Sequence, residues 1–353
     1  MTAKTGFQLA SQALCWMLLV LLAQTAAAQD ERPIKEADRL KAGLQQAEQS
    51  LNFPTATLGG AQFWSDELVF HRWRIQLNAL TGHYRLLDEN EYRHAWGTFE
   101  QCKAKLETIR REKELPAMKG TAVVTLHGLI RSRDAMEGIG EFLEQEGDMT
   151  WINVSYASTR RSIDNHAASL AKVIDNLQGI DKFHFVCHSL GNLVVRRYLG
   201  EATQPEPKWK VDSRIKRFVM LGPPNNGAHF AELFKDNKLF GMLLGPSGKQ
   251  IAAWSEVEKR LGTGNCEFAI IAGSLTGSFT NPLVSGDDDL IVGVEETKLI
   301  GARDFLGVQL NHGNLMSDPY VQKKTLSFLK NGYFIAEDLR HPIEKIAKRR
   351  GDQ

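Results

Sequence analysis

Hydrophobic positions change their spacing along the chain, from a helical period near the N-terminus to short β-rich runs further on. Between Glu36 and about Glu114, apolar residues recur three or four positions apart, a spacing typical of amphipathic helices. Asp88 followed by Glu91 is a plausible start for the last of them. We therefore predict an N-terminal helical segment at 29–115, with its aromatic side chains in a core. Two groups of residues share a predicted helical face: Leu40, Leu44, Ala47 and Leu51, and then Tyr92, Trp96, Phe99, Leu106 and Ile109.

From residue 116 to 335, short apolar runs alternate with helical stretches such as 166–178. Alternation of this kind predicts right-handed crossovers and an α/β domain whose sheet is mostly parallel, with helices on both faces. Ligands of such sheets bind at the carboxyl ends of the strands. The predicted strands lie at 121–126, 151–157, 182–186, 215–221, 267–273 and 304–310.

Two further stretches have helical patterns. The apolar insertion at about 229–261 contains Phe234 and Phe240, and it is consistent either with a lid over the carboxyl ends of the strands or with a pair of core helices. Residues 336–353 form a charged tail that we expect to be helical.

The first 28 residues differ in composition from the rest. Lys4 precedes a short apolar run, and small residues follow it up to Ala28. This layout predicts a secretory signal peptide cleaved near Ala28, so that the mature protein is exported to the periplasm or the medium. An uncleaved membrane anchor is the alternative, although the run is short for a bilayer span.

Composition excludes several classes of protein. The 353 residues are 42% hydrophobic and 24% charged, as in soluble globular proteins. The 43 basic residues balance 42 acidic ones, so there is no basic footprint for nucleic acid. Beyond the signal, Cys102, Cys187 and Cys266 remain; they are too few for a disulfide scaffold, and one bridge between Cys102 and Cys266 is the most to consider.

Ser189 stands where a strand pattern ends and a helical pattern begins, in "KFHFVCHSLGNLVVRRYLG". A serine on such a turn projects its hydroxyl from the carboxyl end of the strand, which is the geometry of a nucleophile elbow. The turn needs small residues two before and two after the serine; Gly191 meets this, and Cys187 replaces the usual first glycine. A serine that only caps the helix is the alternative.

A serine hydroxyl needs a base to remove its proton, and the base needs a carboxylate to orient it. His312 follows the last predicted strand and precedes the last helix, which places it at the same end of the sheet. The acidic loop after the strand at 267–273 offers Asp289, directly before an apolar run, with Asp288 as the second candidate. An exposed acidic loop or a calcium site is the alternative reading of this loop.

Two backbone N–H groups are required to stabilise the negative charge that develops on the substrate oxygen. One is that of Leu190, directly after the candidate nucleophile. The other comes from the loop after the first predicted strand, where His127 and Gly128 precede Leu129. We expect His127 and His188 to shape the site rather than to titrate in the mechanism.

The order serine, acid, histidine is that of α/β-hydrolases, and residues 121–330 resemble that superfamily. The motifs "LHGL", "CHSLGN", "LGPPNNGAHF", "DDDLIV" and "NHGNL" are similar to those of its lipase and GPI inositol-deacylase-like branch. The resemblance implies a triad of Ser189, Asp289 and His312, and a loop at 222–228 near the site. Two residues depart from the pattern, Cys187 for glycine and Leu290 after the acid.

The sequence thus predicts an exported serine hydrolase that cleaves carboxylic esters through an acyl-enzyme. Acyl transfer on the same triad is the alternative among enzymes, and a non-catalytic hydrolase-like binding protein is the alternative of another class. We expect a small-molecule or lipid ester as substrate, with transient contact to a lipid surface. Neither a cofactor nor a metal ion is expected.

Overall fold

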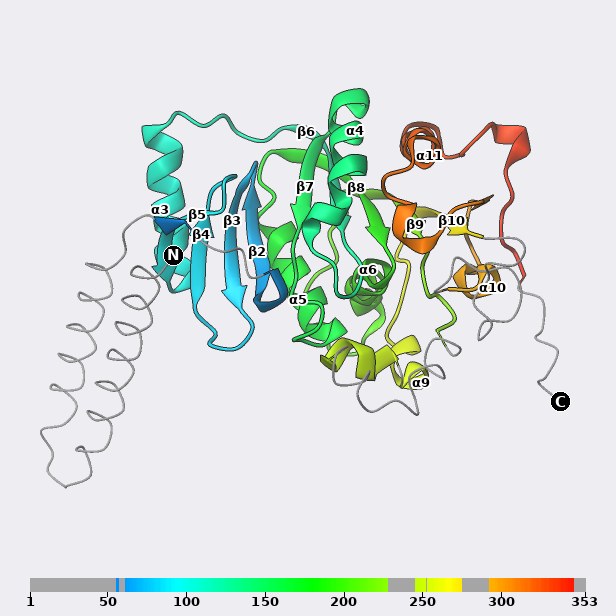
Figure 1. The fold of residues 1–353 in the computed structure, drawn as a ribbon, viewed down its shortest axis with the longest axis horizontal. Coiled ribbons are helices and arrows are strands. Elements are labelled where there is room, and N and C mark those ends of the chain that lie inside the picture. The colour runs from blue at the N-terminus through cyan, green and yellow to red at the C-terminus, as the bar shows by residue number, and fades with distance from the viewer. Residues whose placement is uncertain (1–54, 57–60, 228–244, 252, 275–291, 346–353) are drawn as a thin grey trace, which may run out of the picture. The chain divides into compact units, whose positions relative to one another are not determined.

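A computed structural model describes residues 55–56, 61–227, 245–251, 253–274 and 292–345 (Figure 1). The predicted signal peptide and the predicted helical face of Leu40 and Leu44 lie outside these residues. Among the helices of the described ranges, none has the length and apolar character needed to cross a membrane.

Six parallel strands form the central sheet, in the spatial order β11-β10-β9-β8-β6-β7. All neighbouring pairs are parallel, as expected for strands joined by helical crossovers. The strands predicted at 215–221 and 267–273 have the same bounds in the structure. The six strands are β6 (Gly120–Leu126), β7 (Thr150–Val154), β8 (Ile180–His188), β9 (Ile215–Leu221), β10 (Glu267–Gly273) and β11 (Asp304–Val308).

Helices cover both faces of this sheet. Val124 and Phe185 belong to the core that includes α5 (Ile163–Asp175) and α6 (Leu190–Gly200). The adjacent residues Val123 and Val186 belong instead to the core that includes α4 and α11. Neighbouring strand residues therefore face opposite helix layers, which is why these strands are apolar throughout. The predicted fold class is confirmed. The second layer consists of α4 (Glu137–Gly147) and α11 (Pro319–Asn331).

The prediction of helices is wrong for residues 64–97, which form an antiparallel sheet. Five strands have the order β1-β5-β4-β3-β2, and the one described α-helix before the central sheet is α3 (Phe99–Glu112). Tyr92 and Trp96 thus lie on β5, whereas Phe99, Leu106 and Ile109 lie on α3 as predicted. The strands are β1 (Thr55–Ala56), β2 (Trp64–Phe70), β3 (Trp73–Asn78), β4 (Tyr84–Leu87) and β5 (Tyr92–Gly97).

Local turn chemistry explains this difference. Phe70 pairs with Trp73 across a two-residue turn, in which His71 has a positive φ of 51°, the conformation that tight hairpins require. Asp88 does not begin a helix, because its Oδ1 accepts hydrogen bonds from the amides of Asn90 and Tyr92 in a hairpin loop. The helix begins at Phe99, after the N-cap residue Thr98, which forms a capping box with Gln101.

Buried carboxylates attach the antiparallel sheet to the α/β domain. Asp66 Oδ2 accepts a hydrogen bond of 2.6 Å from the amide of Ser155, which follows β7. Glu67 accepts from Lys172 of α5 at 2.7 Å. Both carboxylates are almost fully buried, and each has a polar partner, as buried charges require.

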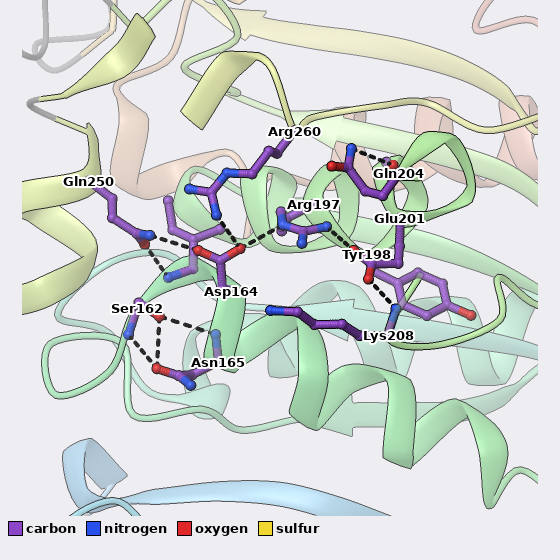
Figure 2. Close-up of polar contacts among 12 residues, drawn as sticks. Ser162, Asp164, Asn165, Arg197, Tyr198, Glu201, Gln204, Lys208, Gln250 and Arg260 are labelled. Carbon is purple, nitrogen blue, oxygen red and sulfur yellow. Dashed lines mark hydrogen bonds and ion pairs between the residues drawn. The ribbon is translucent and has the colours of Figure 1, made fainter. Parts of the chain in front are cut away.

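The second half of the predicted insertion packs into the core. Residues 245–251 are helical, α9 spans Trp254–Glu258, and Ile251, Trp254 and Val257 are buried. Figure 2 shows Asp164 of α5 accepting hydrogen bonds from Arg197, Gln250 and Arg260. Burial by itself would raise the pKa of Asp164. The combined effect of these donors is larger, so the pKa of Asp164 lies below its usual range. This half of the insertion is therefore core, and Phe234 and Phe240 lie outside the described residues.

The prediction of a helical tail after residue 335 is wrong for its described part. Residues 340–345 are not helical; only a 3-10 turn, η5 (Glu337–Leu339), precedes them, because Pro342 opposes a helix and Ile343 instead exchanges backbone hydrogen bonds with residues 301 and 302. Cys102 and Cys266 are free thiols. The first lies on α3 and the second precedes β10, so different parts of the fold hold them.

Candidate active site

Ser189 lies on the tight turn between β8 and α6, as predicted. Its backbone has φ 52° and ψ −120°, a strained combination for a residue other than glycine. The amide of Ser189 donates to the carbonyl of Leu221 at 3.0 Å, which ties the turn to the end of β9. Ser189 is half-buried, while His188 and Leu190 on either side of it are buried.

The turn leaves no room for a side chain at position 191. A Cβ atom on Gly191 would lie 2.7 Å from the carbonyl oxygen of Leu126 and 2.8 Å from that of His127. The predicted requirement for a small residue there is confirmed. Cys187, on the other side of the serine, is fully buried, and burial raises the pKa of its thiol well above the usual value. The neutral thiol does not compete as a nucleophile.

Asn192 is a supporting residue that the sequence reasoning missed. Its Nδ2 donates to the carbonyl of Ser189 at 3.0 Å and to that of Leu221 at 3.2 Å. These bonds hold the strained turn against β9. The available signal was a polar asparagine directly before the apolar run of the predicted helix.

His312 lies at the same end of the sheet as Ser189, in the 3-10 turn η4 (His312–Asn314) after β11. Its ring centroid is 4.4 Å from that of His188, and its carbonyl accepts a hydrogen bond of 2.9 Å from His188 Nε2. Gly222, the residue after β9, lies against the ring, since a Cβ there would be 2.9 Å from His312 Cε1. The fold thus brings the two candidate residues to the same end of the sheet, although β9 and β10 separate their strands β8 and β11, with the start of the 222–228 loop beside His312.

The two other histidines of this region are structural. His188 is buried, and burial, followed by the charges of His312 and Arg131, lowers its pKa well below the usual value. Burial also lowers the pKa of His127 to about 4, and the His127 ring stacks on Tyr156 at 4.2 Å. Both side chains are neutral near pH 7, in agreement with the expectation that they shape the site.

The predicted backbone donors belong to two segments that border Ser189. A Cβ on Gly128 would be 3.1 Å from Ser189 Cβ, so the loop that continues into Leu129 runs directly against the serine. Leu190 is the first residue of α6. The N–H groups of the first turn have no acceptor within their own helix, and they carry its positive dipole end. This end of α6 can therefore stabilise a developing oxyanion.

The predicted acids Asp289 and Asp288 lie outside the described residues. Before that segment, the amide of Ser274 bonds to Val308 of β11 at 2.8 Å, so the chain leaves the sheet beside the strand that leads to His312. Within the described ranges, no group of three or more His, Cys, Asp or Glu side chains could hold a metal ion.

A wide groove lies elsewhere on the molecule, at the opposite ends of the strands. Lys182, Ile215 and Glu267, at or near the starts of β8, β9 and β10, line it. It includes no residue of the predicted site, and we assign it no part in the chemistry at Ser189.

No family model matches the chain, and no curated protein matches its sequence. Among solved structures it is similar to a lipase of Bacillus licheniformis in its mature form, at 16% identity over 62% of this chain and 94% of that one, with a TM-score of 0.44. It is also similar to a thermophilic esterase from Thermogutta terrifontis, at 14% identity over 62% and 92% of the two chains, with a TM-score of 0.40. These sequence identities and TM-scores are low. The fold class of this chain therefore rests on its own architecture.

The parallel sheet, its two helix layers and the strand-turn-helix with a strained serine define the α/β-hydrolase fold.

Proposed function

We propose that this protein is a serine hydrolase that cleaves carboxylic esters through an acyl-enzyme intermediate. The observation that carries the proposal is the strained, half-buried Ser189 at the carboxyl end of β8, at the end of the sheet where His312 contacts the adjacent His188. A nucleophile on a sharp strand-to-helix turn takes such torsions, and they hold its hydroxyl at the end of the strand.

In the proposed reaction His312 takes the hydroxyl proton of Ser189 as the serine oxygen attacks the ester carbonyl. The N–H groups of Leu129 and Leu190 donate to the oxyanion of the tetrahedral intermediate. The intermediate collapses, the alcohol leaves with the proton from His312, and water then hydrolyses the acyl-serine by the same steps. Asp289, or Asp288 as the second candidate, would orient His312.

The substrate we propose is a small-molecule or lipid ester, met in an exported setting after cleavage of the chain near Ala28. An alcohol in place of water at the second step would make the same site an acyltransferase. Chain-length preference among nitrophenyl esters, measured on the purified mature protein, identifies the acyl group that the site accepts.

The decisive test is Ser189→Ala. We expect the folded variant to lose labelling by a fluorophosphonate probe and to lose ester hydrolysis by about a millionfold, as when a triad nucleophile is removed. Circular dichroism and thermal unfolding check that the variant is folded. Comparable turnover by the alanine variant would exclude this mechanism, and a wild-type protein that neither hydrolyses nor labels would favour the alternative of a non-catalytic binding protein.

A further inference from the structure

Gln62 links the antiparallel sheet to the loop that carries the candidate oxyanion donor. It lies in the 3-10 turn η1 (Ala61–Phe63), directly before β2. Its Nε2 donates to the carbonyl of Ile130 at 3.1 Å and to that of Arg131 at 2.9 Å. Both carbonyls belong to the residues that follow Leu129.

The other end of the same amide contacts the loop after β7. Gln62 Oε1 accepts hydrogen bonds of 3.0 Å from the hydroxyls of Ser158 and Thr159. The Ser158 hydroxyl also accepts a hydrogen bond of 3.1 Å from the amide of Ile130. Gln62 and Ser158 together therefore hold the backbone of Ile130 at both its N–H and its C=O.

The loop needs this support because its backbone is strained. Ile130 has a positive φ of 66°, which is a genuine outlier for a β-branched residue. The residue is 57% exposed, so core packing does not impose the conformation. Strain of this kind persists only where the surroundings over-determine it, and the hydrogen bonds of Gln62 and Ser158 do so here.

The position of this loop decides where the Leu129 N–H lies. Gly128 is in close contact with Ser189 and His188, and the amide of Arg131 bonds back to the carbonyl of Gly128 at 3.3 Å. A shift at Ile130 and Arg131 is thus transmitted to Leu129, one residue before Ile130. Small displacements of such a donor reduce the rate strongly.

We propose that Gln62 is a positioning residue of the active site, which holds the Gly128–Arg131 loop in the geometry that directs the Leu129 N–H at the oxyanion. The antiparallel sheet is then part of the catalytic apparatus rather than an independent appendage. This inference rests on the proposed serine hydrolase function.

The test compares three variants of the full mature chain. Gln62→Ala removes all contacts of the amide, whereas Gln62→Glu retains an acceptor for Ser158 and Thr159 but loses the donor to the two carbonyls. Gln101→Ala is the matched control, because Gln101 caps α3 in the same N-terminal region and none of its hydrogen bonds reaches the loop. Thermal unfolding measures the stability of all three.

The catalytic readout is turnover of nitrophenyl butyrate per titrated active site, together with the affinity for a trifluoromethyl ketone, which forms a tetrahedral oxyanion on the serine. We expect both Gln62 variants to lose about 10- to 100-fold in kcat and a similar factor in ketone affinity, with KM little changed. Gln101→Ala should retain both values even if it is less stable. Wild-type kcat and ketone affinity in the two Gln62 variants would overturn the positioning role.

Hydrogen exchange of the peptide 128–132 provides a readout that does not depend on activity. We expect faster exchange in both Gln62 variants and wild-type exchange in Gln101→Ala. Unchanged exchange in Gln62→Ala would overturn the proposal, because the loop would then be held without Gln62. If the wild type neither hydrolyses esters nor labels at Ser189, the proposed function fails, while exchange still decides whether Gln62 holds the loop.

Discussion

At the scale of single residues, the site depends on a strained backbone that its neighbours hold in place. Torsions such as those of Ser189 cost about 1–3 kcal/mol. The amide of Ser189 bonds to Leu221, and Asn192 bonds to the carbonyls of both residues. The strain is therefore offset by local hydrogen bonds that keep the hydroxyl at the end of β8.

The acid of the proposed triad can be assigned by two matched substitutions. Asp289→Asn should lower kcat by more than Asp288→Asn, because only the carboxylate that bonds His312 fixes its tautomer, and loss of that carboxylate costs about 10⁴-fold in a well-studied serine protease. Both variants lose one charge from the same loop, so general electrostatics cancel in the comparison. A larger loss for Asp288→Asn would move the assignment by one residue.

At the scale of elements, close contact between α6 and the end of β6 fixes the nucleophile turn. Gly191 lies so near the carbonyls of Leu126 and His127 that the helix, the turn and the oxyanion loop form one packed unit. Asp164 forms a comparable junction between α5, α6 and the second half of the insertion (Figure 2). Such contacts involve backbone carbonyls or paired charges, and they cannot accept added atoms without movement of the elements they join.

Gly191→Ala should therefore destabilise the protein by about 1–3 kcal/mol and sharply reduce fluorophosphonate labelling. Gly307→Ala in β11 is the control, because a Cβ there meets no atom within 4 Å, and we expect its stability to stay within about 1 kcal/mol of wild type. Urea unfolding measures both. Normal stability and labelling of Gly191→Ala would show that the turn is less tight than the structure indicates.

At the scale of the whole molecule, several buried histidines couple stability to pH. Burial lowers the pKa of His127 and of His184 to about 4, and that of His166 to about 3. The unfolded chain, in which histidine has its usual pKa of about 6.5, binds more protons than the folded chain below that pH. Stability from these groups is present above about pH 6.5 and is lost as the pH falls toward 4.

Urea unfolding at pH 7.5, 6.5, 5.5 and 4.5 tests this coupling. The free energy of unfolding should fall with decreasing pH below about 6.5, by up to about 1.4 kcal/mol per pH unit for each buried histidine. Burial raises the pKa of Asp66. This carboxyl group therefore makes the folded protein more stable as the pH falls, which opposes the effect of the histidines at the lowest pH values. His184→Gln should make the slope shallower, and His341→Gln controls for removal of an exposed ring. A slope unaffected by His184→Gln would contradict the assignment.

The sequence by itself determined the α/β class, the strands of the central sheet and the candidates Ser189 and His312. These follow from local signals, since strands buried on both faces are continuous apolar runs and a nucleophile turn needs small neighbours. The proposal that Asp289 or Asp288 is the acid of the triad rests on the sequence alone. The antiparallel strands at 64–97 do not follow from the pattern, because their aromatic and charged residues also fall at helical spacing and the register of a strand depends on its pairing partners.

Only the tertiary structure decided which distant residues support the site. Gln62 lies 68 positions before Ile130, and nothing in the sequence around either residue indicates the other. Gly222 against His312, and Asn192 against β9, are likewise contacts between elements that are separate in the chain. The spacing of apolar residues indicates which face of one helix or strand packs against a core. Hydrogen bonds between loops form only after the helices and strands have packed.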